Sequence, residues 1–172
     1  MRVFTVGHGA RPLEELVETL RGAGVETLVD VRRFPGSRRH PQFNQQSLAA
    51  ALPEAGIDYR HEVELGGRRS GEPGEERFSC IRTAAFRSYA ARMGQPDWQH
   101  ALERVVAAQM PCVMCAETLW WRCHRRLIAE LLVARGHEVL HLIRPHEYRP
   151  HSPSEEADHR AGALYLCGEL VA

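Results

Sequence analysis

Residues 115–126, CAETLWWRCHRR, bring several chemically reactive side chains into one short segment of the chain. Cys115 and Cys123 are candidate nucleophiles or redox thiols, because the thiolate is the reactive form of cysteine. Glu117 and His124 are the nearby groups that can move protons. A helix predicted to begin near Cys123 would lower the pKa of that thiol through its dipole. The segment therefore predicts cysteine-dependent catalysis.

The same side chains leave two other interpretations open. Free cysteines often pack as small apolar residues, so the two thiols could be purely structural. Zinc is a second alternative, because Cys115, Cys123, His124, Glu117 and His8 are all competent ligands. Against zinc, seven residues separate the cysteines, neighbouring Cys123 and His124 side chains diverge on a helix, and clustered arginines repel a cation. We therefore assign no metal ligands, and no cofactor is firmly implied.

Arginine is the other chemically informative residue type. All 22 basic residues are arginine, which excludes a Schiff base, a P-loop lysine and a lysine general base. Ten of these arginines lie in three short stretches, within residues 32–39, 60–69 and 122–126. If the stretches meet in space, they form a positive face suited to phosphate or carboxylate. The predicted substrate-binding or anion-binding residues are His8, Asp30, Arg32, Arg33, Ser37 and Arg125.

Several of the remaining polar and aromatic residues have both a functional and a structural interpretation. Asp30 beside Arg32 would form an internal salt bridge that shapes the loop, and Arg32 could still face a ligand. An aromatic side chain among arginines suits a nucleobase, but Phe43 could equally anchor the loop in the core. Trp120 and Trp121 could stack on a ligand or simply pack internally.

Length and composition are those of one soluble domain. A chain of 172 residues with 44% hydrophobic and 26% charged residues can bury a core without a disulfide framework. No apolar run approaches the ~20 residues that span a bilayer, and the amino terminus lacks the features of a signal peptide. We therefore expect a cytoplasmic protein without membrane contact, with its five cysteines as free thiols.

Alternating strands and helices must position the reactive residues. Apolar runs predict strands at residues 2–6, 25–31, 57–63, 111–116 and 137–143. Periodicity, glycines and prolines predict helices over about 12–22, 44–55, 78–93, 97–109 and 123–135. This alternation indicates a single α/β domain with a mostly parallel central sheet flanked by helices, a Rossmann-like three-layer arrangement.

The C-terminal part departs from this alternation. Residues 1–143 make up the predicted α/β domain, and residues 144–172 form an extension packed on the same domain. Prolines and charges predict loose order between residues 144 and 160. The last apolar run, GALYLCGELVA, is predicted to be an edge strand or a helical turn.

A parallel sheet would bring the candidate residues together. In such sheets ligands bind at the loops that leave the carboxyl ends of the strands. The loops predicted at 7–12, 32–43, 64–77 and 116–122 all leave strands in this sense. We therefore expect His8, the arginine loop, Gly66 and Gly67 to converge with the cysteine segment.

Five segments of the chain resemble one known family. TVGHG (5–9), DVRRFPGSRRHPQFN (30–44), GIDYRHEVELGGRR (56–69), FRSYAARM (86–93) and CAETLWWRCHRRLIAELLVARGHEVLHL (115–142) are similar in order and spacing to the domain of unknown function 488 family. The resemblance covers about residues 3–143. It implies an α/β fold and a shared site but no reaction, because the family has no assigned function. The site residues that it implies are Asp30, Arg32, Pro35, Ser37, Cys115, Glu117, Cys123, His124 and Arg125.

The chain departs from this family at one position near the amino terminus. Gly9 follows His8, where family members commonly have Ser or Thr. The resemblance therefore supports no hydroxyl role at this position.

Taken together, the sequence predicts an enzyme that acts on a phosphate-bearing substrate, either a nucleotide or a nucleic acid. Arg32, Arg33 and Arg125 would hold the phosphate, and a thiolate at Cys115 or Cys123 would react. The alternatives are a non-catalytic nucleic-acid-binding module and a metal-binding domain. The reaction, the substrate and the oligomeric state stay open.

Overall fold

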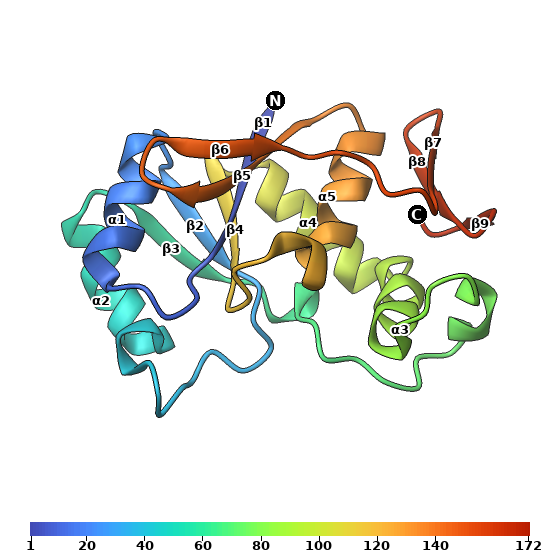
Figure 1. The fold of residues 1–172 in the computed structure, drawn as a ribbon, viewed down its shortest axis with the longest axis horizontal. Coiled ribbons are helices and arrows are strands. Elements are labelled where there is room, and N and C mark those ends of the chain that lie inside the picture. Colours follow the sequence, from blue (N-terminus) through green and yellow to red (C-terminus); the bar gives the residue numbers. More distant parts are fainter.

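The fold is built on one central sheet (Figure 1). The computed structural model describes residues 1–172. The strands of this sheet are β1 (Arg2–Gly7), β2 (Thr27–Asp30), β3 (Asp58–His61), β4 (Pro111–Cys115), β5 (Glu138–Arg144) and β6 (Glu147–Pro150). They lie in the order β3-β2-β4-β1-β5-β6, and every neighbouring pair is parallel except β5 and β6. The predicted single α/β domain with a mostly parallel sheet is confirmed.

Five helices cover the two faces of the sheet. They are α1 (Leu13–Gly22), α2 (Gln45–Glu54), α3 (Ala84–Met93), α4 (Pro96–Val106) and α5 (Arg125–Ala134). Successive strand side chains point to opposite faces, so Val3 of β1 joins the core beneath α3, α4 and α5, whereas Phe4 joins the core beneath α1 and α2. The result is the predicted three-layer arrangement. None of the five helices has the length and apolar content needed to traverse a bilayer.

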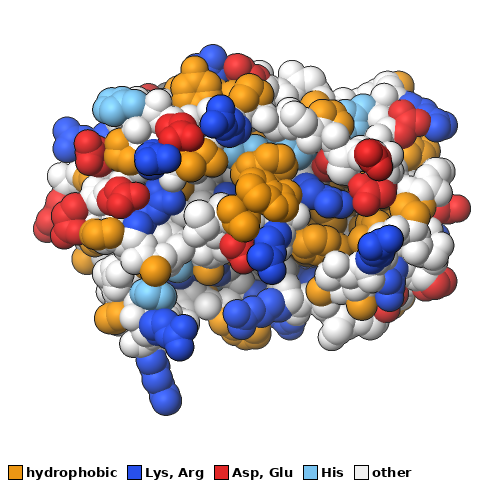
Figure 2. All heavy atoms as spheres, in the orientation of Figure 1, with side chains coloured by type: hydrophobic (Ala, Val, Ile, Leu, Met, Phe, Trp, Pro, Cys, Tyr) orange, Lys and Arg blue, Asp and Glu red, His pale blue; other side chains and the backbone are white.

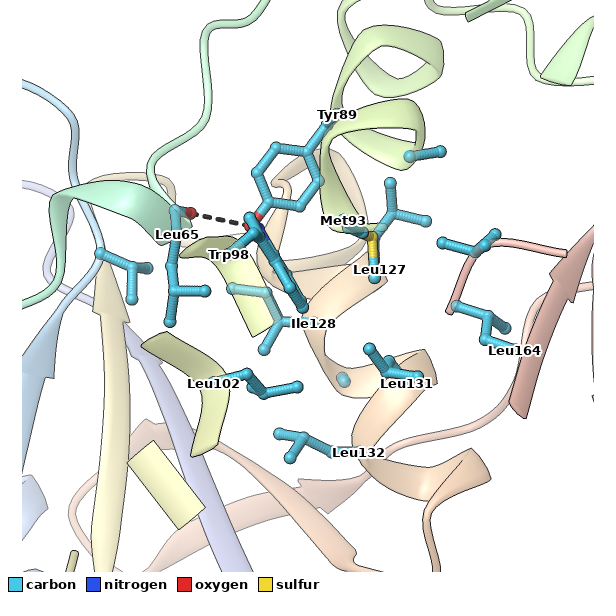
Figure 3. Close-up of a cluster of buried hydrophobic side chains, with 14 of the residues drawn as sticks. Leu65, Tyr89, Met93, Trp98, Leu102, Leu127, Ile128, Leu131, Leu132 and Leu164 are labelled. Carbon is cyan, nitrogen blue, oxygen red and sulfur yellow. Dashed lines mark hydrogen bonds between the residues drawn. The ribbon is translucent and has the colours of Figure 1, made fainter. Parts of the chain in front are cut away.

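The core beneath α3, α4 and α5 contains Trp98 and Tyr89, the two largest fully buried hydrophobic side chains (Figure 3). Trp98 and Tyr89 are almost completely shielded from solvent. The Trp98 indole N–H donates to the Tyr89 hydroxyl at 3.2 Å, and that hydroxyl donates to the Leu65 carbonyl at 2.7 Å. Leu65 ends a 3₁₀ helix, η2 (Val63–Leu65), that follows β3. The core therefore anchors the loop after β3 at a defined position.

The helix predicted over residues 78–93 is shorter in the structure, and its first residues are not helical. A 3₁₀ helix, η3 (Glu75–Phe78), is followed by a turn, and α3 begins only at Ala84. The Arg87 side chain donates to the Ile81 carbonyl at 2.9 Å and to the Arg82 carbonyl at 3.2 Å. The Arg87 side chain therefore supplies the hydrogen bonds that these two backbone carbonyls would otherwise accept within a helix.

The C-terminal extension contains more regular structure than its composition indicates. β6 pairs with β5, and β7 (Ala157–Arg160), β8 (Ala163–Leu166) and β9 (Glu169–Leu170) form a second, three-stranded sheet. The prediction of loose order is therefore wrong for β6 and β7, because backbone hydrogen bonds between strands tolerate exposed, charged side chains. Leu164 and Leu166 are fully buried against the core that contains α5.

One disulfide corrects the expectation that all five cysteines are free thiols. Cys80 and Cys167 form this bond, which leaves Cys112, Cys115 and Cys123 free. The two partners are 87 residues apart, so only the tertiary fold brings them within bonding distance. The bond ties the turn before α3 to the second sheet.

Candidate active site

The carboxyl ends of β1 and β4 place the first candidate residues side by side. The His8 N–H donates to the Cys115 carbonyl at 3.0 Å, so the two loops stay joined beyond the last paired strand residues. Gly7 allows this close approach, because a Cβ at that position would overlap the Glu117 carbonyl oxygen. The convergence expected for loops at this edge is therefore present between β1 and β4.

Two thiols and one imidazole form a cluster at the same edge. Nδ1 of His124 lies 3.6 Å from Sγ of Cys123 and 3.9 Å from Sγ of Cys115. Cys123 and His124 are buried, and Cys115 is half-buried. We call Cys115, Cys123 and His124 the thiol–imidazole cluster.

The backbone before α5 explains why adjacent side chains meet in this cluster. Cys123 is extended, with φ −122° and ψ 151°, and α5 begins at Arg125 with His124 as its N-cap. The helix predicted from Cys123 therefore starts two residues later. The chain turns sharply at such a junction, so the argument that the Cys123 and His124 side chains diverge on a helix is wrong.

The two thiols of the cluster differ in acidity. The pKa of Cys123 is lowered well below its ordinary value, chiefly because the Cys115 thiol donates a hydrogen bond to it and secondarily because His124 and Arg125 favour the thiolate. The pKa of Cys115 is raised well above its ordinary value, because it gives that hydrogen bond and is shielded from water. Within the pair, the thiolate form is therefore favoured at Cys123 over Cys115.

The cluster lines a pocket of about 950 Å³ whose charged residues are mainly arginines. Phe34 and Trp121 also line it, and their side chains are unusually accessible, at 64% and 48% exposure. In the view of Figure 2, arginine side chains lie on several sides of a group of hydrophobic side chains in the middle of the molecule. The charged residues of the lining are Arg32, Arg33, Arg68, Arg82, Arg122, Arg126, Glu117 and Glu156.

Only part of the predicted arginine face reaches the pocket. Arg32 is paired with Asp30, and Arg126 lies 3.7 Å from Glu156. The other four arginines of the lining form no salt bridge, so their guanidinium groups are available to an anion. These four are Arg33, Arg68, Arg82 and Arg122. The members of the three stretches that lie outside the lining are Arg38, Arg39, Arg60, Arg69 and Arg125.

Asp30 and Arg32 form the internal salt bridge that the sequence allows. The Arg32 side chain donates to both carboxylate oxygens of Asp30, at 2.9 and 2.6 Å, and the Tyr59 hydroxyl donates to Asp30 at 2.8 Å. Asp30 is fully buried. Arg32 also lines the pocket, so it shapes the β2 loop while part of it faces the pocket.

His8 lies behind Arg32 and not in the pocket lining. Burial lowers the pKa of His8 to about 4, so the ring is neutral at physiological pH. Its Nδ1 lies 2.9 Å from the Gly9 carbonyl and its Nε2 3.1 Å from Arg32, an arrangement that suits a proton on Nδ1. The ring stacks on buried Phe43, with centroids 4.2 Å apart. His8 therefore contacts Arg32 from the protein interior. Phe43 anchors the loop in the core and does not stack on a ligand.

Three other predicted site residues occupy different surroundings. Ser37 accepts a hydrogen bond from the His40 N–H at 3.0 Å and lies outside the lining. Arg125 is buried and donates to the Thr5 hydroxyl at 3.1 Å and to the Glu117 carbonyl. The Glu117 carboxylate accepts from the Leu119 N–H at 3.1 Å, and Glu117 does line the pocket. Arg125 thus holds the loop after β4 from inside the protein.

Sequence reasoning missed several residues of the lining. Phe34 lies between arginines in the loop after β2, and its aromatic character there was a signal that could have identified it. Tyr89, whose ring centroid lies 5.1 Å from that of His124, falls on an ordinary amphipathic helix. Arg82 was assigned to a helix interior and Glu156 to an irregular tail, so neither carried a local signal.

A buried polar network joins Arg125 to the C-terminal extension. The Thr5 hydroxyl, which Arg125 contacts, lies 2.7 Å from Nδ1 of His141. Nε2 of His141 lies 3.0 Å from Nδ1 of His151, and Nε2 of His151 lies 3.4 Å from the Glu130 carboxylate. The network therefore connects β1, α5, β5 and the segment after β6.

His141 is expected to make the fold sensitive to acid. Burial lowers its pKa from 6.5 to about 3. Below pH 6.5 the unfolded chain binds a proton at this residue while the folded protein does not, so stability falls as the pH falls. This residue alone is expected to remove about 2 kcal/mol of unfolding free energy between pH 7 and pH 5. Urea unfolding at the two pH values should show a smaller loss for His141→Gln, and an unchanged loss would contradict the assignment.

Comparison with known proteins identifies a family without a function. No curated protein and no solved structure matches the chain. A family model described as "Domain of unknown function DUF488" matches residues 12–132, which include the whole thiol–imidazole cluster. The match spans most of the chain and agrees with the motifs that resemble this family. The chain therefore belongs to the DUF488 family.

Proposed function

We propose that this protein is an enzyme that binds a phosphate-bearing substrate, either a nucleotide or a nucleic-acid strand, and carries out cysteine-dependent chemistry on it. The observation that carries the proposal is the position of the thiol–imidazole cluster in the lining of an arginine-rich pocket. Phosphate groups would contact the arginines, and the reacting part of the substrate would reach the cluster.

The lining favours a ligand that has both a phosphate and a base. A planar guanidinium donates two parallel hydrogen bonds to a phosphate, and Arg68, Arg82 and Arg122 are not neutralised by a carboxylate. Exposed aromatic rings beside such arginines suit base stacking. Phe34 and Trp121 provide these rings, and the Arg33 guanidinium lies 5.3 Å from the Phe34 ring centroid.

The thiol–imidazole cluster favours an enzyme over a passive binding protein. Recognition of phosphate and base requires no cysteine, yet two thiols and an imidazole meet in this pocket. Converging reactive groups in a concave site are typical of catalysis. Glu117, in the same lining, is the candidate for proton transfer.

A non-catalytic nucleic-acid-binding module is the second candidate. The unpaired arginines and the exposed Phe34 and Trp121 rings favour it as much as they favour an enzyme. It predicts salt-dependent binding with no conversion of the bound molecule.

Combining Arg68→Gln with Arg122→Gln is expected to weaken binding of a labelled single-stranded oligonucleotide by about tenfold or more, because charge-assisted hydrogen bonds are lost. Fluorescence anisotropy at increasing salt measures this affinity, and nucleotide competition shows whether a mononucleotide suffices. The matched control is Arg21→Gln, which removes an exposed arginine of α1 outside the pocket and should leave binding unchanged.

Mass spectrometry of the bound molecules separates the two candidate functions. Conversion that is lost in Cys123→Ser while binding is retained would support the enzyme. Binding without conversion would support the module. Absence of binding to nucleotides and to oligonucleotides of DNA and RNA at low salt would contradict the proposed substrate class.

A further inference from the structure

We infer that the thiol–imidazole cluster is a zinc site with three protein ligands, Cys115, Cys123 and His124, and an open fourth position. The inference rests on the proposed function, because it assigns a cofactor to the same pocket. In this arrangement the chemistry of the pocket still depends on the two cysteines, but their sulfurs act as metal ligands and not as free nucleophiles.

Distances within the cluster fit a tetrahedral zinc ion. Zinc–sulfur bonds of about 2.3 Å and zinc–nitrogen bonds of about 2.0–2.1 Å at a tetrahedral angle place sulfur and nitrogen about 3.6 Å apart. Nδ1 of His124 lies 3.6 Å from the sulfur of Cys123 and 3.9 Å from that of Cys115. All three donor atoms lie within 4.8 Å of one another, so small shifts would bring each to bonding distance of a central ion.

The surroundings of His124 leave its Nδ1 atom available to a metal. A Cβ at Gly67 would lie 2.5 Å from Nδ1, so a side chain at that position would cover this nitrogen. The contacts of Nδ1 are the two sulfurs, and Nε2 is buried without a hydrogen-bond partner. No partner at Nε2 fixes the tautomer of the ring, so the proton can lie on Nε2 and leave the lone pair of Nδ1 free for a metal.

Charge does not exclude zinc from this site. Clustered arginines alone would repel a cation, but the negative charge of the two thiolates also acts at this site. Two thiolates and one neutral imidazole balance the charge of a zinc ion, so the neighbouring arginines then meet a neutral complex. Thiolate and imidazole donors also select zinc over magnesium and calcium, which prefer oxygen ligands.

The number of ligands assigns the site to the catalytic class of zinc centres. Structural zinc sites are closed by four protein ligands, whereas catalytic sites keep one position for water or substrate. No fourth histidine, cysteine or carboxylate belongs to the cluster, and all three ligands line the pocket. The open position therefore faces the pocket, where a water molecule or a phosphate oxygen would bind.

Metal titration of the full chain tests the inference. Protein purified under reducing conditions and stripped with a chelator is expected to bind one equivalent of Zn²⁺, and Co²⁺ in its place is expected to show the visible absorption of tetrahedral, thiolate-bound cobalt. Cys115→Ser, Cys123→Ser and His124→Asn should each weaken metal binding by about 100-fold or more, because even changes beyond the ligands cost about 10–100-fold. Cys112→Ala, which removes the free thiol outside the cluster, should retain the metal.

A failure of saturable zinc or cobalt binding by the reduced wild-type protein would overturn the inference, whatever the variants do. Undiminished binding in the three ligand variants would also overturn it. Reduction opens the Cys80–Cys167 bond, so the double variant Cys80→Ala/Cys167→Ala must keep the metal as well; loss there would assign the metal to those thiols instead.

Two independent readouts separate the zinc inference from the proposed function. If the wild-type protein binds no zinc but still binds oligonucleotides through its arginines, the zinc inference is wrong and the proposed substrate class stands. If the protein binds one zinc ion but neither nucleotides nor oligonucleotides, the proposed substrate class is wrong and the zinc inference stands.

Discussion

Replacing Asp30 with alanine is expected to lower the unfolding free energy by about 3–5 kcal/mol, because it leaves a buried guanidinium without its counter-charge. The Arg32 side chain is 8% exposed and the Asp30 side chain 0% exposed, so water cannot replace the lost carboxylate. The Tyr59 hydroxyl loses its acceptor at the same time. Urea unfolding of Asp30→Ala and the wild-type protein at pH 7 measures the difference. Asp30→Asn, which keeps a hydrogen-bond acceptor, is expected to lose less.

An exposed pair in the same sheet provides the matched control for this change. Asp58 of β3 lies 2.8 Å from Arg60, with side chains 55% and 49% exposed. Exposed pairs contribute about 0–1 kcal/mol, so Asp58→Ala should change stability little. Similar losses in Asp30→Ala and Asp58→Ala would show that burial does not decide the strength of these pairs.

Replacing Gly7 with alanine is expected to destabilise the fold by about 3 kcal/mol, at the upper end of ordinary overpacking penalties. The added Cβ would overlap the backbone of Glu117 and lie 2.7 Å from Cα of Thr118. Backbone atoms cannot rotate away as a flexible side chain would, so the loop after β4 must shift. That loop joins the two cysteines of the cluster, and zinc or cobalt affinity should fall together with stability.

Gly36→Ala is the control for this steric effect. Gly36 lies in the loop after β2, and nothing lies within 4 Å of a Cβ built on it. Its substitution should be neutral or slightly stabilising, because alanine reduces the freedom of the unfolded chain. A Gly7→Ala variant as stable as Gly36→Ala in urea would show that the loop after β4 moves freely and is not held by β1.

Local sequence pattern is sufficient to predict the central sheet and the edge of it where the candidate site residues gather. Short β-branched and apolar runs bounded by glycine and proline predict β1, β2 and β4 within a few residues, because their side chains must be buried on both faces of a parallel sheet. Parallel strands with right-handed crossovers then place their carboxyl ends at one edge. The expected approach of His8, Arg32 and Cys115 follows from this geometry alone.

Local sequence pattern does not predict the direction in which an individual side chain points. Arg125 follows Cys123 and His124 in one motif, which suggests a shared ligand, yet it points into the interior toward Thr5. The first turn of α5 faces the sheet there, and a buried hydroxyl and a carbonyl accept its hydrogen bonds. Spacing in the sequence cannot show whether an arginine meets a phosphate or a partner on a distant strand, because that partner is chosen by packing.

The sequence by itself determined the fold class, the edge of the sheet where the candidate site lies and the residue types gathered there, because these depend on hydrophobic periodicity and chain connectivity. Only the tertiary structure decided that Cys115, Cys123 and His124 meet within 4.8 Å and that Cys80 reaches Cys167. Those contacts depend on the extended backbone at Cys123 and on the docking of the second sheet. Both are settled by interactions between residues far apart in the chain, which local spacing does not record.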